Sequence, residues 1–334
     1  MARRKTTKAR ALPPAVMKLH FIAEENSTNY IDIWGELSKV NRRFMRQGFN
    51  AAIANVKVTT LPGAPSGGSG ASSYVSTMQH TWPVANSWVK AFHAWKNQQD
   101  EAIEEMGAES AVAAFRDFKV YLERNHKTVG NLACTSIGTP QHTAGPYSLG
   151  VIYNSVPVVA AEEWDYSEIV IPNDGAPGVT GEYTLHMLGP SSGSSKGIIS
   201  GYEFSRSFPT SPDPSTPSIE TSWLNQMQDV GDNSDEIVQN AQDRNAQLPY
   251  DQNEYPGGSS NFMETECQGY VLNQSSTGIN TYNTGPFTAP CGLLKVEFAN
   301  QTPTAPEQIL RNVITITMVP GKHRGYLAET MEEF

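Results

Sequence analysis

Most of this chain consists of short segments with the alternating apolar and polar pattern of β-strands. The clearest are 16–23, 50–61, 74–82, 292–299 and 311–319, with residues that favour turns between them. Gly (27) and Pro (22) are plentiful, whereas charged residues make up only 17% of the 334 residues. Turn residues between short strands are typical of two-sheet β proteins with long ordered loops. We therefore predict a mainly β fold.

A helical period replaces the alternation in one block, 83–124. Apolar side chains such as Trp88, Phe92 and Trp95 recur there every three or four positions. Pro83 suits the first turn of a helix, and Asp100 suits the cap of a second helix. A shorter helix is predicted over 34–47, with Gly48 as its C-terminal stop. The other predicted elements are strands 30–33, 147–153, 164–171, 182–188 and 197–208, β structure within 262–282, and a helix at 234–247.

Positive charge is concentrated in the first ten residues. The whole chain carries a net charge of −10, so five positive charges in this arm leave about −15 on the remainder. A cationic arm can neutralise phosphates while the folded body stays acidic. The arm contains no aromatic residue, so its binding should be independent of base sequence. The predicted nucleic-acid-binding residues are the arm's Arg3, Arg4, Lys5, Lys8 and Arg10, and a second cluster of Lys39, Arg42, Arg43 and Arg46.

Sequence motifs give little support for catalysis. The segment 189–193 matches the G-x-S-x-G spacing of a nucleophile elbow, but that turn requires a helix after the serine, and a strand is predicted there. Cys134 and His142 lie in a loop-like segment, where a buried structural cysteine is the simpler interpretation. Asp251 and Glu254 do not define a sugar-cleaving pair without further geometry. We therefore predict that the chain is not an enzyme.

Metal and cofactor sites are also not indicated. The seven histidines and three cysteines form none of the common zinc spacings, and no phosphate-binding glycine loop is present. An acidic group could offer oxygen ligands to Ca²⁺, but it lacks the glycine and spacing of a known calcium loop. We predict no cofactor. This acidic group comprises Asp229, Asp232, Asp235 and Glu236.

Cellular location is constrained by two absences in the sequence. No apolar stretch approaches the roughly 20 residues that a membrane-spanning helix needs. The basic start is not followed by the apolar region of a secretory signal, and three widely spaced cysteines imply no disulfide framework. We expect a product made in the cytoplasm, without a membrane span.

The order of these features resembles that of the jelly-roll coat proteins of small non-enveloped icosahedral viruses and tailless phages, with single-stranded DNA viruses the most similar. The shared order is a basic arm, a Pro-rich spacer, about eight strands, a helical insertion, and a long insertion before the last two strands. It covers most of the chain. The segments that carry the resemblance are 41–48, 117–121, 163–167, 249–258 and 290–294.

This resemblance implies a viral jelly-roll β-sandwich with a helical insertion at about 83–124 and an irregular insertion at about 209–285. The arm would span 1–15, and the shell domain would span 16–334 with insertions at 83–145 and 209–285. The eight strands of the roll, B to I, would then be 50–61, 74–82, 147–153, 164–171, 182–188, 197–208, 292–299 and 311–319.

The resemblance also implies the function of a major capsid protein. Such a subunit would assemble with many copies of itself into an icosahedral shell and package the viral genome through its arm, with DNA favoured over RNA. Minor capsid proteins are possible further partners. The protein would be made in the host cytoplasm and would end in the virion.

Two alternatives remain open at this point. One is a carbohydrate-binding or carbohydrate-cleaving β-sandwich in which an exposed Trp164 or Trp223 stacks on a sugar ring. The other is a double jelly roll, which needs about sixteen strands, whereas the sequence indicates nearer twelve.

Overall fold

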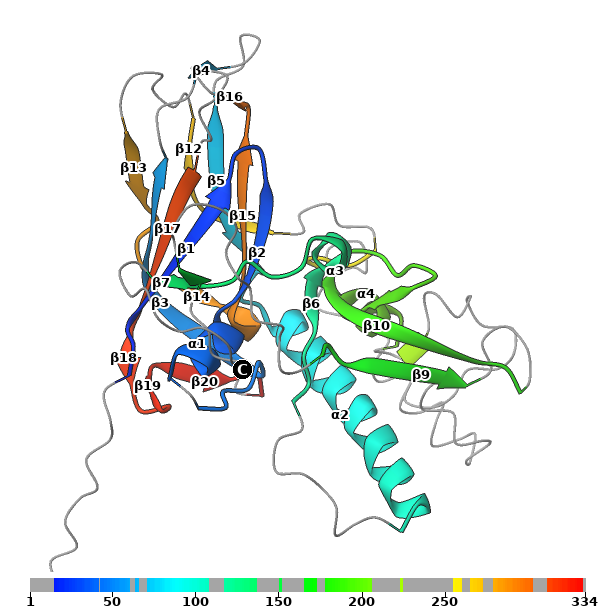
Figure 1. Cartoon of the computed structure of the whole chain (residues 1–334). Helices are drawn as coiled ribbons and strands as arrows, with labels where there is room; N and C mark the ends of the chain where they lie inside the picture. The colour runs from blue at the N-terminus through cyan, green and yellow to red at the C-terminus, as the bar shows by residue number, and fades with distance from the viewer. Residues whose placement is uncertain are drawn as a thin grey trace, which may run out of the picture.

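The structure is a computed structural model, and it confirms the prediction of a mainly β fold. Curled antiparallel sheets form a body consistent with a β-sandwich, and a second, smaller part with a long helix lies beside it (Figure 1). The residues that the structure describes are 15–41, 43–60, 64–65, 71–107, 117–136, 150–151, 165–172, 178–205, 223–224, 255–259, 265–272, 279–302 and 311–332.

Two sheets make up the larger body. In the first, the strand order is β1-β17-β3-β13, and β14 and β20 also pair with β3. In the second, the order is β12-β5-β15-β2. The first sheet comprises β1 (Lys18–Glu24), β3 (Phe49–Thr60), β13 (Asn280–Asn283), β14 (Phe287–Ala289), β17 (Arg311–Met318) and β20 (Ala328–Thr330). The second comprises β2 (Thr28–Asp32), β5 (Ser72–Thr77), β12 (Glu266–Val271) and β15 (Leu293–Ala299).

Strand pairing in these sheets is nested along the chain. Among the eight strands of the two main paths, the first pairs with the last (β1 with β17) and the second with the seventh (β2 with β15). The third likewise pairs with the sixth (β3 with β13) and the fourth with the fifth (β5 with β12), and all four pairs are antiparallel. These eight strands therefore form one long hairpin along the chain, and the segment between β5 and β12 connects its two arms at the closed end.

The core of the sandwich is formed by the inward side of each strand. On β1, Leu19 and Phe21 are fully buried, while Lys18 and Glu24 at its ends are exposed. Ile314 and Ile316 alternate in the same way on β17, next to β1. Burial of each such side chain contributes about 1.5–3 kcal/mol, which explains why the register is tied to this alternation.

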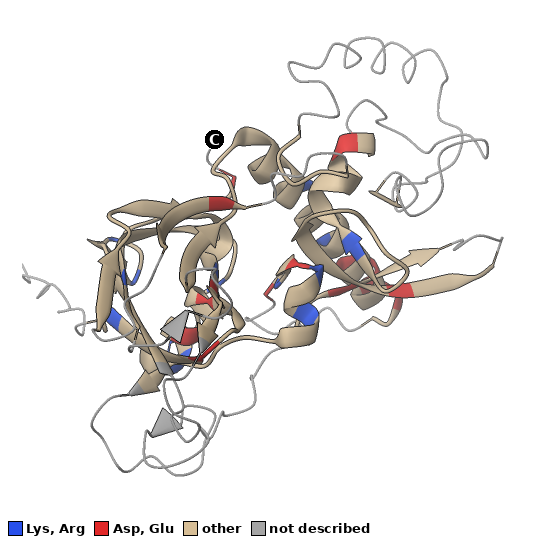
Figure 2. Ribbon diagram, turned by 90° about the horizontal axis from the view of Figure 1, so that it is seen from above, with Lys and Arg blue, Asp and Glu red and all other residues tan. Residues whose placement is uncertain are grey.

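The second part of the molecule is built on a sheet of order β11-β10-β6, in which both pairs are parallel, while β9 pairs with β10 antiparallel. The 24-residue helix α2 carries Trp88 and Trp95 into the core of this part, where Phe118 and Met187 are also buried. The elements are α2 (Trp82–Glu105), β6 (Tyr121–Glu123), α3 (Arg124–Val129), β9 (Glu168–Pro172), β10 (Thr180–Leu188), β11 (Ser195–Gly197) and α4 (Ile198–Ser205). Viewed from above, the strands of the sandwich form a ring beside this part, and most of both is drawn as uncharged residues (Figure 2).

A partly buried ion pair joins the two parts. Glu123 of β6 receives a hydrogen bond from the hydroxyl of Tyr30 and lies 3.0 Å from the ammonium of Lys295 on β15. The Tyr30 ring also stacks on His126 of α3, with their centroids 4.5 Å apart. The two parts therefore pack against each other at this seam.

Short elements complete the molecule. They are α1 (Ile33–Asn41), β4 (Ala64–Pro65) with β16 (Gln301–Thr302), β7 (Thr135–Ser136) with β8 (Gly150–Val151), β18 (Pro320–Gly321) with β19 (Gly325–Tyr326), and the 3₁₀ turn η3 (Pro290–Gly292). Figure 1 shows α1, β18, β19 and β20 at the same end of the sandwich. None of the described helices is long and apolar enough to cross a membrane.

The strand predicted over 197–208 is wrong, because residues 198–205 form helix α4. The apolar and β-branched residues of this segment fit a strand or a helix equally well locally, so burial in the core determines which of the two forms. Ile198 and Ile199 are fully buried in the core that α2 supplies. Gly201 lies so close to Trp223 that a Cβ there would be 2.3 Å from the indole nitrogen. Only the helix brings all these groups into one core.

The helix predicted over 34–47 is shorter, because α1 ends at Asn41. The hydroxyl of Ser38 accepts a hydrogen bond from the Met45 amide (2.8 Å), and the Ser38 carbonyl accepts one from the Arg43 amide (3.1 Å). These bonds turn the chain back over the helix end. Gly48 is therefore not the helix stop.

The helical block predicted over 83–124 is correct only in its first half. Asp100 does not cap a second helix, since it lies inside the continuous α2 and pairs with Lys96 at 3.1 Å. Residues 117–120 are not helical and lead into strand β6. The side chain of Gln47 explains this, because its amide bonds both the N–H (2.7 Å) and the carbonyl (3.1 Å) of Val120, as a neighbouring strand would.

Assignment of the eight sandwich strands also differs from the prediction. The prediction used 147–153, 164–171, 182–188 and 197–208, but β9, β10 and α4 belong to the second part. The sandwich instead uses β1, β2, β12 and β13, which the sequence also predicts as β structure. The prediction favoured strands close together along the chain, whereas burial selected pairs far apart in sequence. The predicted helix 234–247 lies outside the described residues.

Candidate nucleic-acid interface

A closed ring of hydrogen bonds fixes the point where the basic arm joins the sandwich. The amide of Val16 donates to Oδ1 of Asn41 at 3.0 Å. Nδ2 of Asn41 donates to the hydroxyl of Tyr326 at 2.8 Å, and that hydroxyl donates to the carbonyl of Val16 at 2.6 Å. The arm therefore leaves the body beside the end of α1. Residues Arg3, Arg4, Lys5, Lys8, Arg10 and Arg42 lie outside the described part of the chain.

Lys39, near the arm's exit, forms an ion pair with a buried acid. Its ammonium lies 2.9 Å from the carboxylate of Glu36, which is only 3% exposed. Burial raises the pKa of Glu36, while Lys39 opposes that shift. The other carboxylate oxygen accepts a hydrogen bond from the amide of Cys134 at 3.0 Å. The main effect of the Lys39 ammonium is therefore to stabilise the buried carboxylate of Glu36.

Arg43 and Arg46 lie on the turn that follows α1, directly beyond Asn41. Arg46 is exposed, and its guanidinium lies 5.9 Å from the centroid of the Phe44 ring. The structure thus brings three of the four residues of the second basic cluster, namely Lys39, Arg43 and Arg46, to the arm's exit.

Two further basic residues, which the sequence analysis missed, lie at the same end. Lys322 and Arg324 are exposed in the turn between β18 and β19, and Arg324 donates a hydrogen bond to the carbonyl of Phe44. Gly325 of this turn approaches Ala15, where a Cβ would come within 2.6 Å of the alanine side chain. The sequence feature that could have revealed them is the basic segment Lys322-His323-Arg324, which follows the last long strand. The exposed acids Glu329 and Glu332 also lie nearby on the chain, so this end carries both signs of charge.

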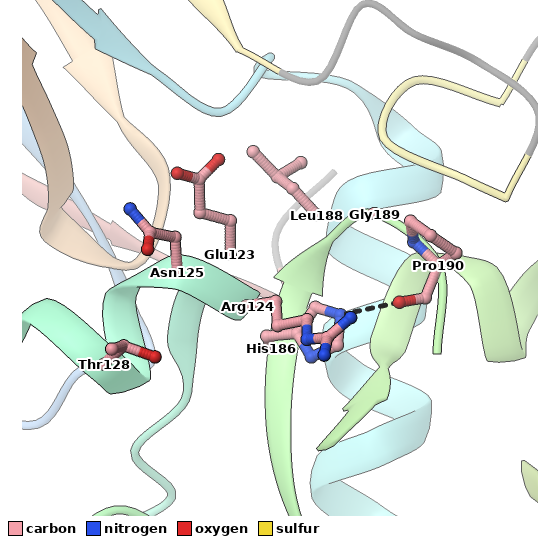
Figure 3. Close-up of a pocket in the computed structure, with 8 residues that line it drawn as sticks. All are labelled: Glu123, Arg124, Asn125, Thr128, His186, Leu188, Gly189 and Pro190. Atoms are coloured by element: carbon pink, nitrogen blue, oxygen red, sulfur yellow. Dashed lines mark hydrogen bonds between the residues drawn. The ribbon is translucent and has the colours of Figure 1, made fainter. Parts of the chain in front are cut away.

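A separate cavity of about 340 Å³ lies between α3 and the end of β10. Figure 3 shows Arg124, Asn125 and Thr128 on the α3 side, with His186 and Pro190 facing them. Glu123, at the rim, is already paired with Lys295. The cavity is open and has a mixed polar and apolar lining, and it lies away from the arm's exit.

His186 in this cavity forms a pair with Ser195 that resembles a nucleophile with its base. Nδ1 of His186 lies 2.6 Å from Oγ of Ser195, and Nε2 lies 3.3 Å from the carbonyl of Pro190. Both residues are at most 1% exposed, and burial lowers the pKa of His186 to about 4. A substrate could not reach this serine, and a backbone carbonyl occupies the position of the orienting carboxylate. The pair therefore stabilises the turn.

Two other catalytic candidates, Ser191 and Cys134, have structural roles. Ser191 of the elbow-like segment accepts a hydrogen bond from the Gly197 amide at 3.0 Å, which closes the turn between β10 and β11. Cys134 is buried, and burial, with Glu36, raises the pKa of its thiol to about 12. Within the described residues no three His, Cys, Asp or Glu side chains could jointly hold a metal ion. His142, Asp229, Asp232, Asp235, Glu236, Asp251 and Glu254 lie outside those residues.

The proposed sugar-stacking role of Trp223 is wrong. This side chain is fully buried, and its indole nitrogen donates to the carbonyl of Gly197 at 3.2 Å. Trp164 lies outside the described residues.

Comparisons with known proteins identify no relative. The chain matches no protein-family model, no curated protein and no solved structure.

Proposed function

We propose that this chain is the major capsid protein of a small non-enveloped virus or tailless phage and has a jelly-roll sandwich. The observation that carries the proposal is the nested pairing of β1 with β17, β2 with β15, β3 with β13 and β5 with β12. A jelly roll is an eight-stranded antiparallel hairpin wrapped into two sheets, and this nesting follows from such wrapping. In this assignment strands B to I are β1, β2, β3, β5, β12, β13, β15 and β17.

A single roll fits better than a double roll. The sheet of the second part contains parallel pairs of β10 with β11 and with β6. A second jelly roll would require antiparallel pairing throughout. The second part is then an insertion between strands E and F.

Exposed apolar side chains at one edge support self-assembly. Tyr270 on β12 is 61% exposed, Leu272 is 55% exposed, and Ile279 beside β13 is 65% exposed. β12 and β13 are also the last strands of their sheets. Within the described part of the chain no further strand pairs with these edges. Edge strands with exposed apolar side chains are usually covered by a partner, and copies of the same chain would serve in a closed shell.

The charge distribution supports packaging of nucleic acid. The arm residues carry five positive charges, and the body to which they are joined is acidic. Arg43, Arg46, Lys322 and Arg324 extend this positive charge onto the folded end from which the arm leaves. The packaged polymer would be the viral genome, with DNA favoured over RNA, and minor capsid proteins could join the shell. We place the protein in the virion after synthesis in the host cytoplasm. No enzymatic activity and no cofactor are part of the proposal.

Electron microscopy of the purified protein tests assembly. We expect regular closed particles. Deletion of residues 1–10 should leave the unfolding midpoint unchanged while strongly reducing the nucleic acid that copurifies with particles. Monomers at all salt and protein concentrations would contradict the capsid proposal. Particles whose nucleic-acid content is unchanged by the deletion would contradict the role of the arm.

A further inference from the structure

A small aromatic cavity of about 160 Å³ opens beside the exit of the arm. Its walls carry four aromatic rings, those of Phe49, Trp88, Phe92 and Phe118. The Trp88 and Phe92 rings are stacked with centroids 5.2 Å apart, and Phe118 meets Trp88 edge-on at 5.6 Å. The cavity is too small for most drug-sized ligands, which occupy about 300 Å³ or more. It suits one compact planar ring system.

The Trp88 side chain on one wall offers its ring and not its donor. Trp88 is 5% exposed, and its indole N–H, which has no hydrogen-bond partner among the residues that the structure describes, is itself buried. The cavity therefore favours stacking against flat aromatic rings over hydrogen bonding to this indole.

The mouth of the cavity adds a carboxyl group and a guanidinium. Asp117 lines it and accepts a hydrogen bond of 3.4 Å from the Gln47 amide. Burial, together with the nearby Asp32, raises the pKa of Asp117 to about 7, so this group can either donate or accept near neutral pH. Arg46 lies at the same mouth, and Glu332 is the other charged residue there.

The surroundings of the cavity point to a polyanion that carries flat rings. Arg46 belongs to the turn that begins at Asn41, and Asn41 holds the first described residues after the basic arm. A phosphate chain attracted by the arm and by Arg46 would bring its bases to the cavity. The aromatic walls match the stacking face of a base, and the carboxyl group of Asp117 can bond its polar edge.

We infer that this cavity binds one unpaired base of a single-stranded nucleic acid, between the Phe49 side and the Trp88–Phe92 wall. The inference rests on the proposed packaging of nucleic acid and adds a base-dependent contact to the charge-dependent arm. Binding stays independent of base sequence, as expected for the arm. Every base has an aromatic face, so the contact selects unpaired bases over duplex without reading a sequence.

Equilibrium binding of two short single-stranded oligonucleotides tests this inference. One oligonucleotide carries mixed bases, and the other has the same length and phosphates but only abasic sugars. Stacking of one base contributes about 1–3 kcal/mol, so we expect the full-length protein to bind the base-containing strand about tenfold more tightly. Equal affinity for the two strands would overturn the inference while the capsid proposal stands. Failure to bind either strand at low salt would overturn both.

Variants locate the contact. Phe92 is half-buried, so Phe92→Leu should fold, remove most of the tenfold preference, and leave the affinity for the abasic strand unchanged. Phe287→Leu is the matched control, because this half-buried ring packs in the other core cluster. Deletion of residues 1–10 should weaken binding of both strands by the same factor. A preference unaffected by Phe92→Leu would overturn the assignment to this cavity.

Photo-crosslinking gives a readout that needs no variant. A strand containing 5-bromouracil should crosslink to the peptide that contains Trp88 and Phe92, and DNA and RNA versions distinguish the polymer. Crosslinks confined to residues 1–15 would overturn the inference.

Discussion

Asn41 holds the backbone of Val16 at the exit of the basic arm, with its side-chain oxygen 3.0 Å from the Val16 amide. The same side chain donates to the carbonyl of Leu37 at 2.9 Å and to the hydroxyl of Tyr326. One residue at the end of α1 thus connects the first strand, the helix and the last hairpin. The direction in which the arm leaves depends on this connection.

Replacement of Asn41 should therefore loosen the exit of the arm. Asn41→Ala removes three hydrogen bonds at a partly buried place, and we expect a loss of about 2 kcal/mol in the free energy of unfolding. Chemical denaturation measures that loss. Limited proteolysis should cut the variant after Val16 faster than the wild type. Tyr326→Phe, which removes two bonds, the one to the Val16 carbonyl and the one from Asn41, should show a smaller effect in the same direction.

Introduction of charge at the exposed β12 edge should block assembly without unfolding the subunit. Leu272→Asp places a carboxylate among the apolar groups proposed to contact a neighbouring copy, and its desolvation opposes association. We expect particles to be replaced by small species in analytical ultracentrifugation. Val179→Asp, at a side chain 47% exposed beside β10, is the control and should assemble normally. Normal assembly of the Leu272 variant would place the interface elsewhere.

His186 should make stability depend on pH in a defined window. Burial lowers its pKa to about 4 in the folded state, below its usual value of about 6.5. Between these values the unfolded chain binds more protons, so this residue's contribution is fully present above pH 6.5 and is lost as pH falls toward 4. The shift corresponds to about 3 kcal/mol. Denaturation of wild type and His186→Asn from pH 4 to 7 should show a stability difference that grows with pH.

Asp117 should make stability change with pH in the opposite direction, so its variant is the control for the His186 experiment. Its raised pKa means that the folded state holds a proton which the unfolded state releases above about pH 4. Stability from this group therefore decreases as pH rises from 4 to 7. Asp117→Asn should gain stability relative to wild type over that range. If both variants showed the same sign of slope, the assignment of either group would be wrong.

The close approach of Gly48 to Trp88 should make Gly48 intolerant of a side chain. A Cβ at this position would lie 2.6 Å from Cη2 of the Trp88 ring. Gly48→Ala should therefore cost about 1–3 kcal/mol through overpacking, measured by thermal or chemical unfolding. Gly193→Ala is a suitable control, because its Cβ would meet nothing within 4 Å. A neutral effect at Gly48 would mean that the indole can move aside.

Local pattern was sufficient for the elements whose side chains have one consistent period. Alternation predicted β1, β3, β15 and β17 to within a few residues, and the period of Trp88, Phe92 and Trp95 predicted α2. The same reasoning failed at 198–205, where the apolar run suited a strand as well as a helix. It also failed at 117–120, because the partner that holds the backbone of Val120 is Gln47, 73 residues away.

The candidate site was likewise predictable from the sequence only in part. Charge counting alone identified the basic arm and the cluster from Lys39 to Arg46, since a charge is a property of a residue and not of its neighbours. It could not reveal that Lys39 is paired with Glu36, that Arg324 lies at the arm's exit, or that Trp88 and Arg46 line one cavity. These facts depend on distances between residues remote in sequence.

By itself the sequence determined the strand-rich character of the protein, the long helix and the separation of a cationic arm from an acidic body, because periodicity and charge are local. Only the tertiary structure decided which strands pair. β1 lies against β17, with Lys18 opposite Thr317, and no local pattern specifies a partner some three hundred residues away. That choice is made by burial of the apolar faces together and by satisfaction of the backbone hydrogen bonds, which only the complete fold achieves at once.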